Sequence, residues 1–162
     1  MTLQSAQAVA LVAAILTSGL LAGLFYTFSC AVTPGLRRVD DHIFTSTFQA
    51  INVAILNGRF LLIFGGTPLL TTVAAVLHIP EGHHVALLWI VAALACHIAT
   101  LVITGGANVP LNNRLAAAPT ATDIERATIR TQFELAWTRW NLVRTLTSTA
   151  GFAGLVVAAS LQ

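Results

Sequence analysis

The chain has 162 residues, of which 56% are hydrophobic and only 9% are charged, and its mean hydropathy is +0.81. A soluble domain carries about a quarter charged residues, so this composition excludes an ordinary soluble protein. The net charge is only +2 and the sequence has no basic stripe, which excludes a nucleic-acid partner.

Long stretches without any charged side chain dominate the sequence. They cover residues 1–36, 60–80, 82–113 and 145–162. Each supplies close to the roughly 20 residues that a helix needs to cross a hydrocarbon core. The sequence therefore predicts an all-α polytopic membrane protein, a four-transmembrane-helix bundle that forms a single domain over residues 1–162.

The first two spans are separated by an amphipathic segment. The first span is expected over about residues 9–31, and Thr33-Pro34-Gly35 is expected to end it. This apolar stretch is longer than the apolar region of a secretory signal peptide, and it lacks the basic start that such a peptide has. Residues 37–59 carry apolar side chains near helical spacing and predict an amphipathic helix at the membrane interface. The second span is expected over about residues 60–77.

The last two spans differ in how they begin and end. A turn over residues 78–84 leads to the third span, about residues 85–104, which Gly105-Gly106 and Pro110 are expected to end. Thr122 is a candidate N-cap for a polar helix that continues into the fourth span, about residues 141–161, as a cytoplasmic extension. The turn contains His83 and His84, but no carboxylate motif accompanies them, so no metal site is predicted.

The positive charges indicate an orientation. The chain has no lysine, and its eight arginines all fall in the first and third loops or at their edges. The positive-inside rule places these loops in the cytoplasm and both termini outside. The expected location is the inner (plasma) membrane of a bacterium, with the lipid bilayer as partner and a second copy of the chain as a candidate one.

Polar side chains gather where the third span ends and the fourth begins. Asn108 and Asn112 follow the third span, and Trp137, Asn141 and Arg144 open the fourth at positions i, i+4 and i+7 of one helix face. Polar groups are rare in such a chain and mark candidate functional sites. Indoles can stack on a flat aromatic ligand while amides and a guanidinium bind its oxygens.

This cluster also has a purely structural interpretation. Trp137, Trp140 and Arg144 can be interfacial anchors, and Asn112 and Asn141 can join helices by hydrogen bonds. Asn52 and its neighbours at the start of the second span can either cap a helix or join the same pocket.

Two histidines are candidate bases. His97 falls in the middle of the third span, where a histidine is either a packing residue or a general base, proton relay or haem ligand. His42 lies near the cytoplasmic interface. No phosphate-binding loop, Ser-His-Asp set or pair of catalytic carboxylates is present, so hydrolase and kinase functions are excluded.

Four segments resemble the small anthrone oxygenase-like membrane proteins of bacteria, a family that also includes fungal anthrone oxygenases of polyketide pathways. They are Phe28–Leu36, Gln49–Asn57, Asn108–Asn113 and Trp140–Arg144. They occur in the family's order and cover most of the chain. The resemblance implies oxidation of an anthrone to a quinone by dioxygen, with no cofactor motif, although haem or copper stays open.

Roles for individual residues follow from this resemblance. Oxygen-holding donors are expected at Asn108, Asn112, Asn141 and Arg144, with Trp137 or Trp140 stacking on the substrate. The base is expected at His97 or His42, and Asn52 and Pro110 are expected to contact the substrate. The alternatives are a non-catalytic membrane protein that binds a lipid or apolar ligand or forms an oligomeric scaffold, and a haem-binding oxidoreductase.

Overall fold

The computed structural model describes residues 2–80 and 84–161, and every regular element in these ranges is helical. The predicted turn at residues 78–84 lies partly outside them, and His83 with it. Four helical stretches are long and apolar enough to cross a membrane: Leu3–Leu36, Gly58–His78, His84–Ala117 and Asp123–Ser160. Each contains one predicted span, so the four-helix membrane bundle is confirmed.

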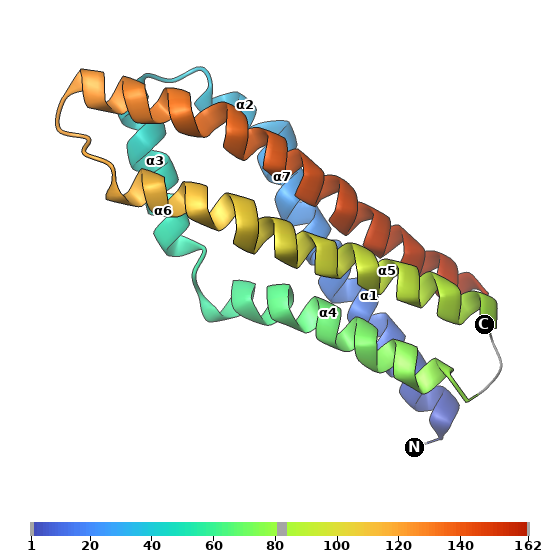
Figure 1. Cartoon of the computed structure of the whole chain (residues 1–162). Helices are drawn as coiled ribbons and strands as arrows, with labels where there is room; N and C mark the ends of the chain where they lie inside the picture. Colours follow the sequence, from blue (N-terminus) through green and yellow to red (C-terminus); the bar gives the residue numbers. More distant parts are fainter. Residues whose placement is uncertain (1, 81–83, 162) are drawn as a thin grey trace.

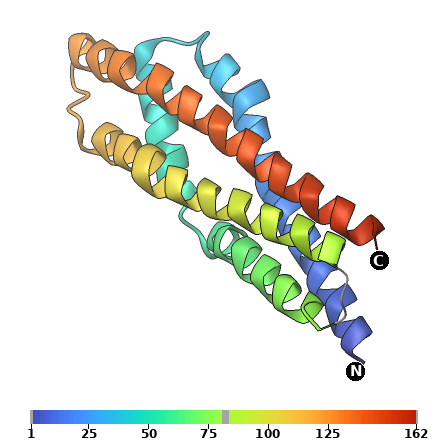
Figure 2. The same ribbon diagram turned by 45° about the vertical axis from the view of Figure 1, so that its right-hand side comes forward.

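The four long helices pack side by side (Figure 1). They are α1 (Leu3–Thr27), α4 (Gly58–His78), α5 (His84–Ile103) and α7 (Asp123–Ser160). Neighbours pack in the closed order α1, α4, α5, α7 and back to α1. Both termini lie at one end of the bundle, and Figure 2 shows the same arrangement from a second direction.

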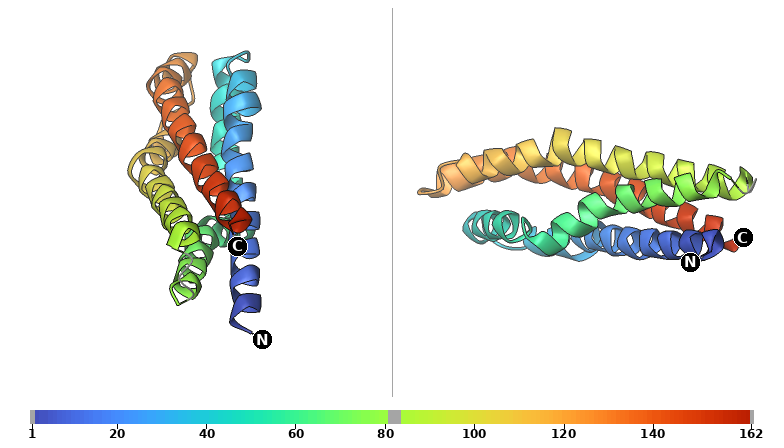
Figure 3. Two further views of the ribbon diagram at one scale, coloured as in Figure 1. Left: turned by 90° about the vertical axis from the view of Figure 1, so that its right-hand side faces the viewer. Right: turned by 90° about the horizontal axis from the view of Figure 1, so that it is seen from below.

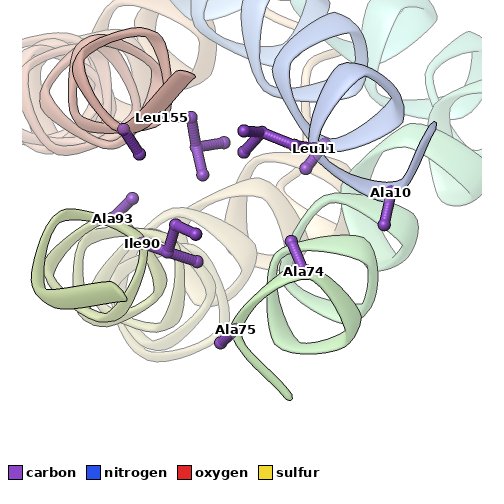
Figure 4. Close-up of a cluster of buried hydrophobic side chains, with 9 residues drawn as sticks. Ala10, Leu11, Ala74, Ala75, Ile90, Ala93 and Leu155 are labelled. Carbon is purple, nitrogen blue, oxygen red and sulfur yellow. The ribbon is translucent and has the colours of Figure 1, made fainter. Parts of the chain in front are cut away.

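Small side chains fill the core at the end where the termini lie. Alanines from all four helices pack there around Leu11, Ile90 and Leu155, which are at most 2% exposed (Figure 4). Small residues let helices approach closely, which is how helices associate where lipid removes the hydrophobic driving force.

Two prolines that were expected to end helices do not. Pro34 and Pro110 each lie just after a π-helix, Phe28–Val32 (η1) and Thr104–Asn108 (η2), and the chain continues as α2 (Thr33–Leu36) and α6 (Val109–Ala117). The wide π turn bonds Thr33 N to Phe28 O and Val109 N to Thr104 O. It relieves the clash of a proline ring with the carbonyl four residues earlier, so the helices continue.

The amphipathic helix, α3 (Asp41–Ala54), is shorter than predicted and is capped by the Asp40 carboxylate, which accepts from Ile43 N at 2.8 Å. Its apolar side is buried against α6 and α7, which extend beyond the four-helix region (Figure 3). An aromatic cluster forms there, with Phe48 at 4.9 Å from Phe133 and 5.0 Å from Trp137 between ring centroids. Its position at a membrane interface stays a prediction.

The polar helix and the fourth span form one continuous helix, as predicted. Thr122 caps α7 in a capping box: its hydroxyl accepts from Glu125 N at 3.3 Å, and the Glu125 carboxylate accepts from Thr122 N at 2.9 Å. At 1.5 Å per residue α7 is about 57 Å long, well beyond the roughly 30 Å of a hydrocarbon core. The first half of α7 therefore carries α3 and α6 outside the four-helix region.

One arginine of α7 holds the connection between α2 and α3. The Arg130 guanidinium donates to Asp41 Oδ1 and Glu134 Oε2, both at 2.9 Å, and to the carbonyls of Leu36, Arg37 and Val39. Those carbonyls lie at the C-terminal end of α2, where a cation is favourable.

Replacing Arg130 with alanine is expected to lower the free energy of unfolding by about 2 kcal/mol, because five hydrogen bonds are lost at a half-buried site. Thermal unfolding in detergent measures the change, and limited proteolysis should show faster cleavage near residues 37–40. Arg139→Ala is the control because that side chain is exposed on the same helix. Equal stability of the two variants would contradict the assigned role of Arg130.

Candidate functional site

A cavity of about 70 Å³ lies where the aromatic cluster meets the four-helix region. It is bounded by residues from α1, η1, α3, the loop before α4, α4, η2, α6 and α7. The lining residues are Phe25, Phe28, Ile51, Asn52, Ile55, Leu56, Phe60, Thr104, Val109, Asn112, Trp137 and Arg144. The wall is therefore mostly aromatic and aliphatic, with a few polar groups, which is the usual make-up of a small-molecule site.

Among the described residues on this wall, the charged one is a buried arginine. Arg144 is 6% exposed, and its guanidinium carbon lies 4.4 Å from the ring centroid of Phe25 and 5.4 Å from that of Trp137. Among the described residues no carboxylate forms an ion pair with it, and its Nε has no hydrogen-bond partner. A guanidinium is permanently charged, so this site holds an uncompensated cation in a nonpolar environment.

Asn141 joins α7 to α1 and orients that arginine. Its Nδ2 donates to Phe25 O at 3.1 Å and to Ser29 Oγ at 2.8 Å, and its Oδ1 accepts from Arg144 Nη2 at 2.8 Å. Asn141 is fully buried and is not on the cavity wall. The structure therefore places it behind Arg144, as a helix joint that positions the guanidinium.

The second π-helix and α6 bring the other two amides to α7. Asn112 Oδ1 accepts from Trp137 Nε1 at 2.8 Å, which fixes the indole, and Asn112 is one of the residues that line the cavity. Asn108 is fully buried, and its Nδ2 donates to Trp137 O at 3.4 Å. Asn108 lies behind the wall and not on it.

A second donor on the wall also lacks a partner. Asn52 comes from α3, and its Nδ2 is buried without a hydrogen bond. With Arg144 Nε it gives the cavity two buried donors that no protein acceptor satisfies. Buried polar groups are normally paired, so these two donors are available to a ligand with acceptor oxygens.

Besides Asn108 and Asn141, four candidate residues do not line the cavity. Trp140 is 43% exposed and Pro110 is exposed, so neither contributes to the lining. His42 is exposed near the start of α3, about 15 Å along the helix from Asn52. His97 lies on α5, about 10 Å before the lining residue Thr104 along the same helical stretch, and it faces Gly151 on α7, about 10 Å along that helix from Arg144.

His97 is packed tightly instead. Its Nε2 lies 3.3 Å from Ser18 Oγ, its Nδ1 is buried without a partner, and its ring lies directly against the Gly151 backbone. This is the packing alternative for His97. The described residues contain no group of three or more His, Cys, Asp or Glu side chains that could hold a metal ion.

Most of the apolar lining could not be identified in the sequence. Phe25, Phe28, Phe60 and Val109 look like any other residues of a hydrophobic span, and Thr104 like a helix-packing threonine. Phe28 and Thr104 are the first residues of the two π-helices. The sequence signal was a proline shortly after each of these segments, because a proline within a helix favours a π turn. Such turns often occur at functional sites.

The fold and the site together define a helical membrane-type bundle with an aromatic cavity whose polar groups are hydrogen-bond donors around a buried cation. Comparison with known families agrees, because residues 60–154, more than half of the chain, match the anthrone oxygenase family. The chain belongs to the anthrone oxygenase family, which confirms the resemblance seen in its motifs. No curated protein and no solved structure matched the chain.

Proposed function

We propose that the protein is a membrane-embedded oxygenase that oxidises an anthrone-type polycyclic phenol to a quinone with dioxygen. The observation that carries this proposal is the uncompensated Arg144 guanidinium on the wall of an aromatic cavity. Family membership over residues 60–154 supports it, since that range contains Asn112, Trp137 and Arg144.

The chemistry of the reaction explains what the cavity has to supply. Loss of one methylene proton converts an anthrone to an extended, electron-rich anion that reacts with dioxygen. A carbon–oxygen bond forms at the former methylene carbon and gives a hydroperoxide. Loss of the second methylene proton with cleavage of the O–O bond leaves the carbonyl and one water molecule. The equation balances with dioxygen alone, so the proposal calls for no cofactor, and stoichiometric haem or copper in active protein would contradict this part.

Arg144 is assigned the role of stabilising that anion. No histidine or carboxylate is among the described residues that line the cavity, so neither His97 nor His42 is placed to take the proton directly. A fixed cation next to the substrate oxygen favours the deprotonated form, and this effect is strong in a water-excluded site. We assign the oxyanion to Arg144, with Asn52 and Asn112 as further donors, and the proton is released to solvent before the wall closes on the bound anion.

The cavity is too small in this structure to hold the proposed substrate. Its volume of about 70 Å³ is far below the roughly 300–1,000 Å³ of small-molecule sites, so a tricyclic ligand requires the wall to move. Ile55 and Leu56 of the wall lie in the short loop between α3 and α4, so these two residues can move without a shift of either helix.

Oxygen consumption tests the proposed function. Purified protein in lipid nanodiscs is given an anthrone, and dioxygen uptake and quinone absorbance are followed against protein-free nanodiscs. We expect uptake above autoxidation with one dioxygen consumed per quinone formed. A rate equal to autoxidation would contradict the proposal and favour a non-catalytic binder of apolar ligands.

Replacing Asn52 with leucine is expected to raise KM about tenfold and to leave thermal stability unchanged. Its Nδ2 has no protein partner to lose, whereas a bound oxygen loses one hydrogen bond, worth about 1.4 kcal/mol. Steady-state kinetics and thermal unfolding check the two parts. Asn113→Leu, at an exposed position of α6, should change neither, and equal kinetics of the two variants would remove Asn52 from the site.

We further propose that the chain lies in a bacterial plasma membrane with both termini outside. The arginines belong to the segments at the end opposite the termini or, for Arg139 and Arg144, to the middle of α7. Positive segments are retained in the cytoplasm. Labelling of single cysteines introduced at exposed positions 2 and 121 by a membrane-impermeant maleimide tests this, and only position 2 should react in intact cells.

A further inference from the structure

A second hollow lies directly beside the cavity, on the outer side of the bundle between α1 and α4. It is a groove of about 320 Å³ whose wall is largely apolar, formed by Leu20, Leu21 and Leu24 of α1 and by Ile55, Phe60 and Ile63 from the other side. Leu20 is 61% exposed. Because α1 and α4 both have the composition of membrane spans, this groove faces the region that lipid would occupy.

Two of the described side chains belong to the walls of both the groove and the cavity. Ile55 and Phe60 line both hollows. Phe60 lies in the first turn of α4, with its ring stacked on Phe64 at 5.2 Å between centroids, and Ile55 belongs to the short loop before that helix. A change in the position of these two side chains would join the hollows into one, whose volume lies within the roughly 300–1,000 Å³ of ordinary small-molecule sites.

An arginine lies on each side of the wall that Ile55 and Phe60 form. Arg59 lines the groove and Arg144 lines the cavity, and no described carboxylate forms an ion pair with either. The neighbouring Asn57 amide is already used, since it accepts from Phe60 N at 3.1 Å and donates to Ala54 O at 2.8 Å. An aromatic molecule with an oxygenated edge can therefore place its rings in the groove, with that edge at Arg59. When the molecule moves on into the cavity, the same edge reaches Arg144.

We propose that this groove is the lateral portal through which a flat, apolar aromatic substrate passes from the bilayer to the Arg144 cavity. The Phe60 side chain closes this path and has to move to open it. The proposal rests on the proposed function for the identity of the substrate. A polycyclic phenol partitions into lipid, so it reaches the protein from the side at which the groove opens. The portal acts on the rate of access and not on the chemistry at Arg144.

Binding kinetics of a non-reactive probe test the portal separately from turnover. The probe is 1,8-dihydroxyanthraquinone, and surface plasmon resonance on nanodiscs, with empty nanodiscs subtracted, measures its association and dissociation. Leu20→Trp fills the groove. Leu16→Trp is the matched control, because Leu16 lies one turn earlier on α1 with nearly the same exposure, 63% against 61%, and does not line the groove.

We expect Leu20→Trp to slow association and dissociation about tenfold each, with Kd changed less than about threefold, and Leu16→Trp to match the wild type. Phe60→Ala should speed both rates about threefold or more, which keeps the test open if Leu20→Trp does not fold. Unchanged rates in Leu20→Trp and Phe60→Ala would overturn the portal and indicate a lipid acyl chain in the groove. Equal slowing by both tryptophans would overturn it too. Absence of turnover in the wild type, with probe binding intact, would contradict only the proposed function.

Discussion

Replacing Arg144 with methionine is expected to reduce anthrone oxidation about 100-fold or more while thermal stability in detergent is kept or raised. The loss of activity follows from removal of the cation that stabilises the substrate oxyanion, since deletion of one such donor costs about 10²–10³ in rate. Dioxygen uptake and thermal unfolding of the same preparation measure the two effects.

The stability effect has the opposite sign because the guanidinium is desolvated without a counter-ion. Arg144 keeps one hydrogen bond, to Asn141, and contacts the faces of Phe25 and Trp137. A methionine of similar length retains the apolar contacts and removes the buried charge, and replacement of buried ions by apolar groups is often neutral or stabilising by about 1–4 kcal/mol. Loss of activity together with unchanged or higher stability is the result expected for a residue that serves function at the expense of stability.

Two controls separate this role from structural ones. Arg139→Met removes an exposed arginine of the same helix and should change neither property. Arg144→Lys keeps the charge but not the planar donor array, so it should recover part of the activity. If Arg144→Met unfolds at a much lower temperature than the wild type, the arginine is a structural joint, and its assignment to the oxyanion is wrong.

Replacing Gly151 with alanine is expected to destabilise the protein by about 2 kcal/mol. A Cβ at this position would lie 2.4 Å from His97 Cε1 and 2.7 Å from its Nδ1. The imidazole is fully buried between α1, α5 and α7 and is held near Ser18, so it has little room to retreat. Overpacking costs typically 1–3 kcal/mol, and here it exceeds the roughly 1 kcal/mol that alanine gains over glycine in a helix.

Thermal unfolding with a double variant checks the origin of the effect. In the Gly151→Ala, His97→Ala protein the new methyl group meets no ring, so its additional cost should disappear, and the two substitutions should be strongly coupled. Gly23→Ala is the control, because its Cβ would have no neighbour within 4 Å. A Gly151→Ala protein as stable as the Gly23→Ala protein would contradict the packing described for His97.

The sequence alone determined the class of fold and the membership of the polar cluster. Charge-free stretches of spanning length fix the four helices, because a helix is the simplest structure that satisfies its backbone within lipid. The helical period places Trp137, Asn141 and Arg144 on one face, and all three are buried. The N-cap at Thr122 followed from the chemistry of a short side chain before a helical segment.

Tertiary structure decided which members of that cluster share a cavity. Pro34 and Pro110 read as helix ends because the local rule for proline assumes α-helical bonding, and only the π-helices relieve the clash. Asn52 and Phe60 join Arg144 through contacts between segments far apart in the chain, which no local period records. His97 was a candidate base by its type and depth, but the glycine that receives its ring lies on another helix. The sequence determines which polar groups enter the membrane region because burying each one is costly. Packing between helices determines which of them remain unpaired and available to a ligand.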